Sequence, residues 1–331
     1  MNHSRIRVLA ASGALVFAAA SLAGCSSSAP ADTGASAAGP TDITVATYPV
    51  MSNAAVYIGV NEGIFEENDL NVTLQTITSG PDSIPLLLSG DLTFTSIDVP
   101  TAVNAAKEGI GVVAVGAQMV GVDVDKGYVG VVAGANSGIT DWKGLEGKKV
   151  GVNALGSTPV ALISASMKAV GADPSTVQWV QIAQPETIPA LLAGQLDAAN
   201  LAQPLLTAAE EQGFVQVGNP EQLTVPNVPT FLYVTTAQYA SEHPEVVRQF
   251  QTALEASNAR ANADHALAIE TSKTSTTVDP AVLEKVTGFP NWGEKPITGA
   301  DIDKFIDLMV DAGQLDASSA PSGDDIMVKL P

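Results

Sequence analysis

The sequence has little positive charge, few histidines and one cysteine. It carries 15 Lys and Arg residues against 35 Asp and Glu residues, and its three histidines are His3, His243 and His265. A strongly acidic chain repels nucleic acid and anionic lipid headgroups, so we expect no nucleic-acid partner. The sequence also contains no glycine-rich phosphate loop of the P-loop type, no HExxH motif and no Cys/His ligand set. We therefore expect no metal site and no cofactor.

Long apolar runs are scarce as well. After residue 24 the sequence has no run of about 18 apolar residues, which is what a membrane-spanning helix needs. The apolar run at residues 8–20 is shorter than the ~20 residues that cross a bilayer, and it follows a basic segment with Arg5 and Arg7. A basic segment, a short apolar run and small residues before a cysteine are the layout of a secretion signal.

The end of this signal offers two interpretations. The plainer one is a cleaved signal followed by an unmodified cysteine. The stretch LAGC at residues 22–25, however, resembles the bacterial lipobox, and Cys25 is the only cysteine in the sequence. The resemblance implies that residues 1–24 are a lipoprotein signal peptide and that Cys25 is lipidated and begins the mature chain. Its acyl chains then anchor the protein to the outer face of the cytoplasmic membrane.

The residues after the signal predict a flexible tether at 25–41. They read SSSAPADTGASAAGPT after Cys25, with small, turn-forming residues and no apolar period, so they cannot bury enough surface to become ordered. We expect the folded part to begin near Asp42. Removal of residues 1–24 leaves 13 cationic against 35 anionic side chains, a net charge of about -22.

The folded part contains an internal repeat. At an offset of 104, ten of the 29 positions from 81 to 109 are identical, among them Gly90 and Gly194. Apolar residues at i, i+3 and i+4 predict a helix in each copy, and the two glycines suit the left-handed residue that ends it. Pro85 and Pro189 are expected in the first helical turn. Each copy then reads as a helix, a short strand and a second helix, which is typical of α/β units.

Two similar units in a chain of 331 residues predict two lobes with a cleft between them. The β-rich runs at 128–134 and 230–236 suggest the two crossings between the lobes, and two such connections form a hinge. The residues from 243 to 315 are helical by period and are expected to pack back onto the first lobe. The predicted boundaries are 42–130 for the first part of lobe one, 131–230 for lobe two and 231–331 for the return to lobe one.

Five stretches together carry a family resemblance. They are NEGIFEENDLNV (61–72), LLSGDLTF (87–94), LEGKKVGVNALGST (145–158), LLAGQLDAANLAQP (191–204) and HPEVVRQF (243–250). In this order and spacing they resemble the extracytoplasmic substrate-binding proteins of ABC importers, of the nitrate, sulfonate and taurine type with its pyrimidine-precursor relatives. The resemblance implies an α/β, two-lobed periplasmic-binding-protein fold of type II, with two parallel-sheet lobes joined by a two-strand hinge. It also implies an ABC permease and its ATPase subunits as partners, and we expect a monomer.

Ligands of open parallel sheets bind beyond the carboxyl ends of the strands, where helix N-termini can hold an anion or a carbonyl oxygen. The loops at the predicted strand ends contain no Lys or Arg, although oxyanion binders of the family often place a cation there. The candidate ligand-binding residues are the small, polar or wall-forming residues at these ends. They are Tyr48, Met51, Ser52, Asn53, Ser79, Gly80, Asp98, Gln118, Asn153, Gly156, Ser157, Thr158, Gln184, Asn200 and Gln203.

Several of these residues have a structural alternative. Ser52 and Ser157 could be N-caps, and Asp98 could cap the helix that opens at Pro100. Tyr48 is expected to be partly core and partly cleft wall, and Trp292 is either a cleft wall or a lid. If Asp98 faces the cleft, it favours a ligand with an amino group, so that a zwitterion or a neutral heterocycle fits better than a dianion.

The sequence and the resemblance therefore predict a binding protein, with no catalytic residues, that captures a small polar organic solute outside the cytoplasmic membrane by lobe closure and delivers it to an ABC permease. The expected ligand is sulfonate-, taurine- or nitrate-like, or a heterocycle. An alternative is an enzyme related to pyrimidine-precursor synthases, but none of the histidines lies in a predicted cleft loop, and His243 and His265 are expected to be solvated. A third possibility is a structural or ligand-sensing lipoprotein with no role in transport.

Overall fold

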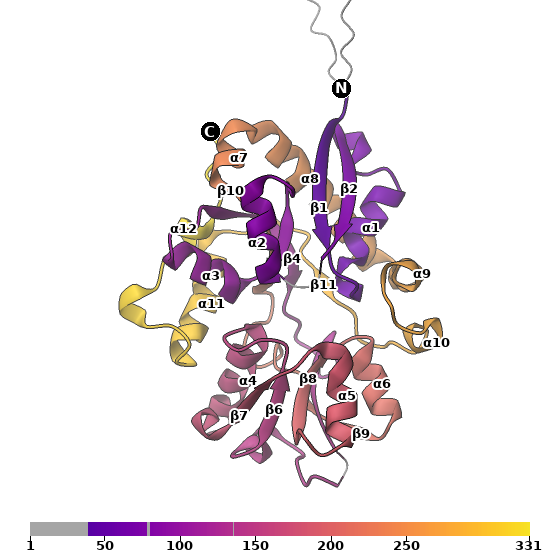
Figure 1. The fold of residues 1–331 in the computed structure, drawn as a ribbon, viewed down its shortest axis with the longest axis vertical. Coiled ribbons are helices and arrows are strands. Elements are labelled where there is room, and N and C mark those ends of the chain that lie inside the picture. Colours follow the sequence, from indigo (N-terminus) through magenta and orange to yellow (C-terminus); the bar gives the residue numbers. More distant parts are fainter. Residues whose placement is uncertain (1–38, 78–79, 135) are drawn as a thin grey trace, which may run out of the picture. The chain divides into compact units, whose positions relative to one another are not determined.

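The computed structural model describes residues 39–77, 80–134 and 136–331 (Figure 1). Gly39–Pro331 forms one compact unit. The predicted signal peptide, Cys25 and most of the predicted tether lie outside the described residues. Within the described part of the chain, no helix is long and apolar enough to cross a membrane.

The first lobe is built around two small sheets. A pair of parallel strands, β1 (Thr41–Thr47) and β2 (Leu70–Thr76), lies beside a four-stranded sheet in the order β11-β4-β10-β3. The bounds of these four strands are β3 (Thr95–Asp98), β4 (Val112–Val120), β10 (Pro229–Thr236) and β11 (Asn291–Trp292). A parallel bridge between Val45 and Phe94 joins β1 to the start of β3.

The second lobe contains one five-stranded sheet in the order β7-β6-β8-β5-β9. Alternate residues of strand β5, which lies between β8 and β9, belong to different apolar clusters, because successive side chains of a strand point to opposite faces. Val131 and Ala133 pack with α4 (Thr158–Ala169), whereas Val132 packs with α5 (Gln184–Leu192) and α6 (Leu205–Glu211). The strands are β5 (Val129–Gly134), β6 (Lys149–Val152), β7 (Gln178–Gln181), β8 (Ala198–Ala202) and β9 (Phe214–Gly218).

The four-stranded sheet is antiparallel throughout and the five-stranded sheet is mixed, whereas parallel sheets were predicted for both lobes. β10 runs antiparallel to β3 and β4, and β5 runs antiparallel to β8 and β9. Each of these two strands is the first one after a connection from the other lobe. Each of them therefore runs away from the other lobe. The strands antiparallel to it run in the opposite direction, so their carboxyl ends point toward the other lobe. The loops that follow β3, β6, β7 and β8 thus lie at the ends where the two lobes face each other.

The connections between the lobes run directly before these strands. The chain leaves β4 at Val120, passes through residues 121–128 and enters β5 at Val129. It returns through residues 219–228 into β10. The β-rich runs that the sequence suggested as crossings are strands β5 and β10 themselves.

The internal repeat is confirmed, since both lobes contain the same succession of elements. In the first lobe α2 (Gly80–Ser89), β3 and α3 (Val99–Lys107) follow one another, and α5 (Gln184–Leu192), β8 and α6 (Leu205–Glu211) do so in the second. Gly90 and Gly194 have φ of +83° and +67°, as expected for left-handed residues after a helix. Upstream, 3-10 helix η1 (Met51–Asn53) with α1 (Ala54–Asn61) in one lobe corresponds to α4 (Thr158–Ala169) in the other.

The expected position of two prolines was wrong. Pro85 and Pro189 lie inside α2 and α5 and not in the first turn. These helices begin at Gly80 and Gln184, so Pro81 and Pro185 occupy the early positions, where a missing N–H costs nothing. The repeat thus contains two prolines per helix, and only the first of each pair marks its start.

The C-terminal segment is mostly helical and packs on the first lobe. It comprises α7 (Ala237–Glu242), α8 (Pro244–Ala263), α9 (His265–Ser275), α10 (Pro280–Leu283), α11 (Gly299–Asp311) and α12 (Gly323–Ile326). Phe250 of α8 stacks on Phe94 with ring centroids 3.8 Å apart and packs beside Val45. This contact fixes α8 against β1 and β3.

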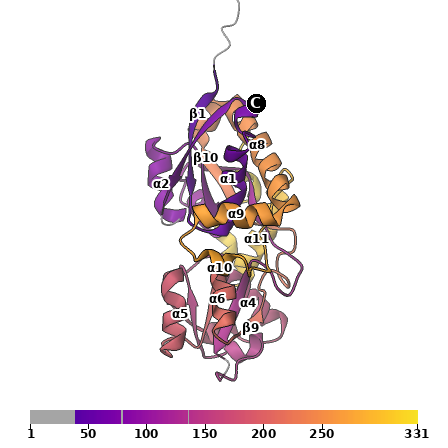
Figure 2. The same cartoon turned by 90° about the vertical axis from the view of Figure 1, so that its right-hand side faces the viewer.

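Parts of the C-terminal segment also reach the second lobe. Phe305 and Ile306 of α11 share an apolar cluster with Ala161 and Leu162 of α4. In Figure 2, α10 lies between α9 of the first lobe and α6 of the second. After α10, Lys285 forms an ion pair with Glu211 at the end of α6, with 2.5 Å between Nζ and Oε1. The two lobes are therefore in contact at several places besides the two connections.

Candidate functional site

Two side chains of the first lobe donate hydrogen bonds to the loop after β1. The backbone oxygen of Ser52 in η1 accepts a hydrogen bond from Trp292 Nε1 at 2.8 Å and another from Gln118 Nε2 at 3.3 Å. Trp292 is only 1% exposed and packs beneath α1. It is thus neither a lid nor an exposed cleft wall but the anchor of the loop, and nothing local in its sequence indicated this role.

Two tyrosines border the same loop. The hydroxyl group of Tyr128, at the entry to β5, hydrogen-bonds to the side chain and backbone of Ser52. Tyr48 donates a hydrogen bond to the backbone oxygen of Ser96, whose hydroxyl in turn donates to Gln118. Burial raises the pKa of both tyrosine hydroxyls to about 12, so they remain protonated hydrogen-bonding groups at neutral pH. Tyr128 was missed as a site residue, although the β-rich run that it opens had been noted.

Asp98 connects the two lobes. Its Oδ1 accepts a hydrogen bond from Thr101 N at 3.1 Å and so caps α3. Its Oδ2 accepts one from Thr158 N at 3.1 Å and another from Thr158 Oγ1 at 3.3 Å, at the first position of α4 in the second lobe. The capping role and the position facing the other lobe were weighed as alternatives, and the structure combines them in one carboxylate.

Three of the candidate side chains have buried polar atoms without a hydrogen-bond partner. Asn53 is 1% exposed, and neither its Oδ1 nor its Nδ2 has a hydrogen-bond partner. In the second lobe, Oδ1 of Asn200 and Oε1 of Gln184 are also buried without a partner, and Gln184 Nε2 donates to the backbone oxygen of Asn200 at 3.4 Å. Buried amides without partners are rare in proteins because each costs about 1–3 kcal/mol.

The two serines are not capping side chains. Ser52 lies inside η1, which begins after Val50, and Ser157 occupies the N-cap position of α4 without a side-chain cap hydrogen bond. The hydroxyl of Ser157 instead donates to the backbone oxygen of Ala154 at 2.6 Å. The N-cap alternative is therefore wrong for the side chains of both residues.

The remaining candidates have varied positions. Gln203 is buried, and its Oε1 accepts hydrogen bonds from the backbone and hydroxyl of Thr207, so it stabilises the start of α6. Asn153 and Gly156 are exposed, with Gly156 left-handed at φ +72°. Gly80 opens α2, and Ser79 lies outside the described residues.

An apolar cluster joins both lobes beside these polar groups. Met51 packs with Met119, Tyr128 and Leu283, and Ala202 at the end of β8 lies against the same cluster. Met51 therefore places η1, with Ser52 and Asn53, next to the carboxyl end of the strand that carries Asn200. Among the described residues, the loops at these strand ends include the carboxylate of Asp98 and contain no Lys or Arg.

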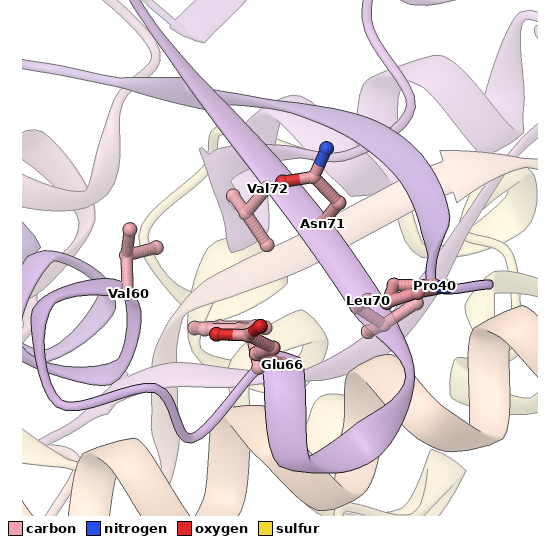
Figure 3. Close-up of a pocket in the computed structure, with 7 residues that line it drawn as sticks. Pro40, Val60, Glu66, Leu70, Asn71 and Val72 are labelled. Carbon is pink, nitrogen blue, oxygen red and sulfur yellow. The ribbon is translucent and has the colours of Figure 1, made fainter.

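A hollow on the opposite edge of the first lobe is not part of this site. It has a volume of about 250 Å³ and is lined by Pro40, Glu66 and Leu70, among others (Figure 3). Pro40 precedes β1 and Leu70 begins β2, so the hollow lies at the amino ends of these strands. The facing loops lie at their carboxyl ends.

The two histidines in the described part of the chain lie at the surface. His243 and His265 are exposed, as expected, and His265 stacks on Phe289 with ring centroids 4.0 Å apart. Among the described residues, no group of three or more His, Cys, Asp or Glu side chains could hold a metal ion.

The strand order, the two connections and the facing polar strand ends define the two-lobed periplasmic-binding-protein fold, as predicted. The chain matches the alkanesulfonate-binding protein SsuA from Xanthomonas axonopodis pv. citri, solved with MOPS bound, with a TM-score of 0.73 and 18% identity, over 88% of this chain and 100% of that one. It matches the periplasmic nitrate-binding protein NrtA from Synechocystis with a TM-score of 0.65 and 14% identity, over 84% and 83% of the two chains. At these identities the likeness shows the fold alone.

Sequence comparison gives the family. Residues 51–266 match the model of the NMT1/THI5-like family, and the chain belongs to this family. It is 27% identical over 211 residues to the taurine-binding periplasmic protein of Escherichia coli (strain K12). That match covers 63% of this chain and 63% of the relative, which is less than two thirds of the relative's length. The relatives named here are all named as binding proteins, for alkanesulfonates, nitrate and taurine.

Proposed function

We propose that this protein captures a small polar organic solute outside the cytoplasmic membrane, between its two lobes, and delivers it to an ABC permease. The fold, the family and the binding proteins among its relatives support this proposal. Lipidation of Cys25 provides the membrane anchor, and the permease with its ATPase subunits is the partner. The solute is neutral or zwitterionic.

The observation that carries the proposal is the set of unpaired buried amides. Asn53 from one lobe and Gln184 and Asn200 from the other have donors or acceptors that the protein itself leaves unsatisfied. A ligand with complementary donors and acceptors, such as an amide, an amino acid or a polar heterocycle, would satisfy them on closure. A neutral or zwitterionic solute fits best because the facing loops hold no cation to neutralise a dianion.

The direct test uses Gly39–Pro331, which is a compact unit by itself. Thermal unfolding is measured with amino acids, taurine, pyrimidines and short sulfonates. A ligand at a hundredfold its Kd stabilises the folded state by about 2.7 kcal/mol, which is easily measured. Absence of any shift across the panel, together with unchanged tryptophan fluorescence, would contradict the proposal.

Substitutions separate a ligand contact from a structural one. Asn53→Leu and Asn200→Leu remove unpaired amides, so the free protein should keep or gain stability while ligand affinity falls at least tenfold. Asn258→Leu is the matched control, because Asn258 is equally buried and its Oδ1 is also unpaired, but its Nδ2 donates to Ala117 O at 3.1 Å and to Gly293 O at 2.7 Å. This variant should lose stability and retain affinity. The same response from all three variants would count against the assignment.

A further inference from the structure

The N-terminus of α4 has little hydrogen-bonding capacity left for a ligand. Residue 159 is a proline and has no N–H, and the N–H groups of Val160 and Ala161 donate to Ser157 O at 3.1 and 3.3 Å. Among the first four residues of the helix, the remaining N–H belongs to Thr158, and Asp98 accepts it. The hydroxyl of Ser157 is directed to Ala154 O.

Asp98 therefore occupies the place that an anion would take at this helix terminus. Its carboxylate lies between the positive ends of two helix dipoles, α3 in its own lobe and α4 in the other, and hydrogen-bonds to both. An oxyanion could bind the Thr158 N–H only by displacing Asp98, and it would then face a negative charge at close range.

Apolar packing holds the N-terminus of α4 next to Asp98. Ala161 and Leu162, on the turn after Thr158, are buried in the cluster that contains Phe305 and Ile306 of α11. The start of α4 is therefore held against the first lobe independently of Asp98. Replacing Asp98 should leave the terminus in place and expose its donor.

We propose that Asp98 is a specificity-determining residue that fills the N-terminus of α4 with an internal carboxylate and so excludes oxyanions, sulfonates included, from that position when the lobes close. This inference rests on the proposed function and narrows its substrate class. The ligand engages the amides of Asn53, Gln184 and Asn200 and does not place an anionic group on α4. The chain thus differs in ligand chemistry from relatives named for sulfonates, although it shares their fold.

The test is a titration of Gly39–Pro331 with methanesulfonate, followed by calorimetry, in the wild type and in Asp98→Ser. Serine retains an oxygen that can cap α3 but is too short to reach Thr158. The expected result is at least a tenfold gain in methanesulfonate affinity. Asp98→Asn, which removes the charge with little change in shape, should shift affinity in the same direction and guards against misfolding of the serine variant.

Asp141→Ser is the matched control, because Asp141 is also an N-cap, accepting from Gly144 N at 2.9 Å, but is exposed and caps a different helix. It should leave methanesulfonate affinity unchanged. Equal affinity in all four proteins, including no binding in any, overturns the inference, as does weaker binding in Asp98→Ser. If the wild type binds a neutral or zwitterionic ligand but Asp98→Ser and the wild type bind methanesulfonate equally, the inference fails and the proposed function stands.

Discussion

Glu221 should make the stability of this protein depend on pH in an unusual direction. It lies in the second connection between the lobes, is 3% exposed, and its Oε2 is buried without a partner. The N–H of Val122, in the first connection, hydrogen-bonds to its carboxylate. Loss of solvation nevertheless dominates and raises the pKa of Glu221 from 4.5 to about 7.

The size of the effect follows from this shift. One pKa unit corresponds to about 1.4 kcal/mol, so ionising Glu221 costs the folded state about 3 kcal/mol more than the unfolded chain. Between pH 4.5 and about 7 the folded state retains a proton that the unfolded state has lost. Stability therefore falls as pH rises through this window and stays at the lower level above it.

The assay is urea unfolding of the wild type and of Glu221→Gln at about pH 4.5, 6 and 8. Glutamine has the same shape and no charge, so the free energy of unfolding of the variant minus that of the wild type should increase by about 3 kcal/mol from the lowest to the highest pH. The control Glu67→Gln, at an exposed position, removes the same charge. Its free energy of unfolding should differ from that of the wild type by no more than about 0.5 kcal/mol at every pH. A pH-independent difference for Glu221→Gln would refute the reasoning.

Two further substitutions test contacts that hold the site. Gly288→Ala places a Cβ 2.0 Å from Gly127 O in the first connection, so it should lower the free energy of unfolding, measured in urea, by about 1–3 kcal/mol. The control Gly111→Ala adds a Cβ that meets no atom within 4 Å and should lower it far less. Similar losses in both variants would contradict the contact. Trp292→Phe removes the donor to Ser52 O and should lower the free energy of unfolding by about 1–3 kcal/mol in the same assay. The control Trp179→Phe, at a half-buried position, should lower it less. An equal loss in both variants would show that the hydrogen bond does not contribute to stability.

Much of the fold could be predicted because its signals are local. Gly90 and Gly194 end their helices in the left-handed conformation, and the matching apolar spacing around them revealed a duplicated unit. A duplicated α/β unit implies two lobes with facing strand ends. The candidate site followed from the same reasoning, and Asn53 and Asn200, selected only as polar residues at strand ends, prove to be buried with unpaired atoms.

Other features depend on residues far apart in the chain. Trp292 contacts Ser52 across 240 positions, and Asp98 contacts Thr158 across 60, so no periodicity or spacing could indicate either pair. The antiparallel direction of β5 and β10 likewise depends on the side from which each strand enters its sheet.

The sequence by itself therefore determined the duplication, the helix ends and the polar composition of the loops, because backbone conformation and apolar period are set by neighbouring residues. Only the tertiary structure decided which of those loops meet and which polar groups are already paired. Asp98 illustrates the difference, since its identity as a helix cap is local, whereas its occupation of the N-terminus of α4 exists only when two lobes are brought together.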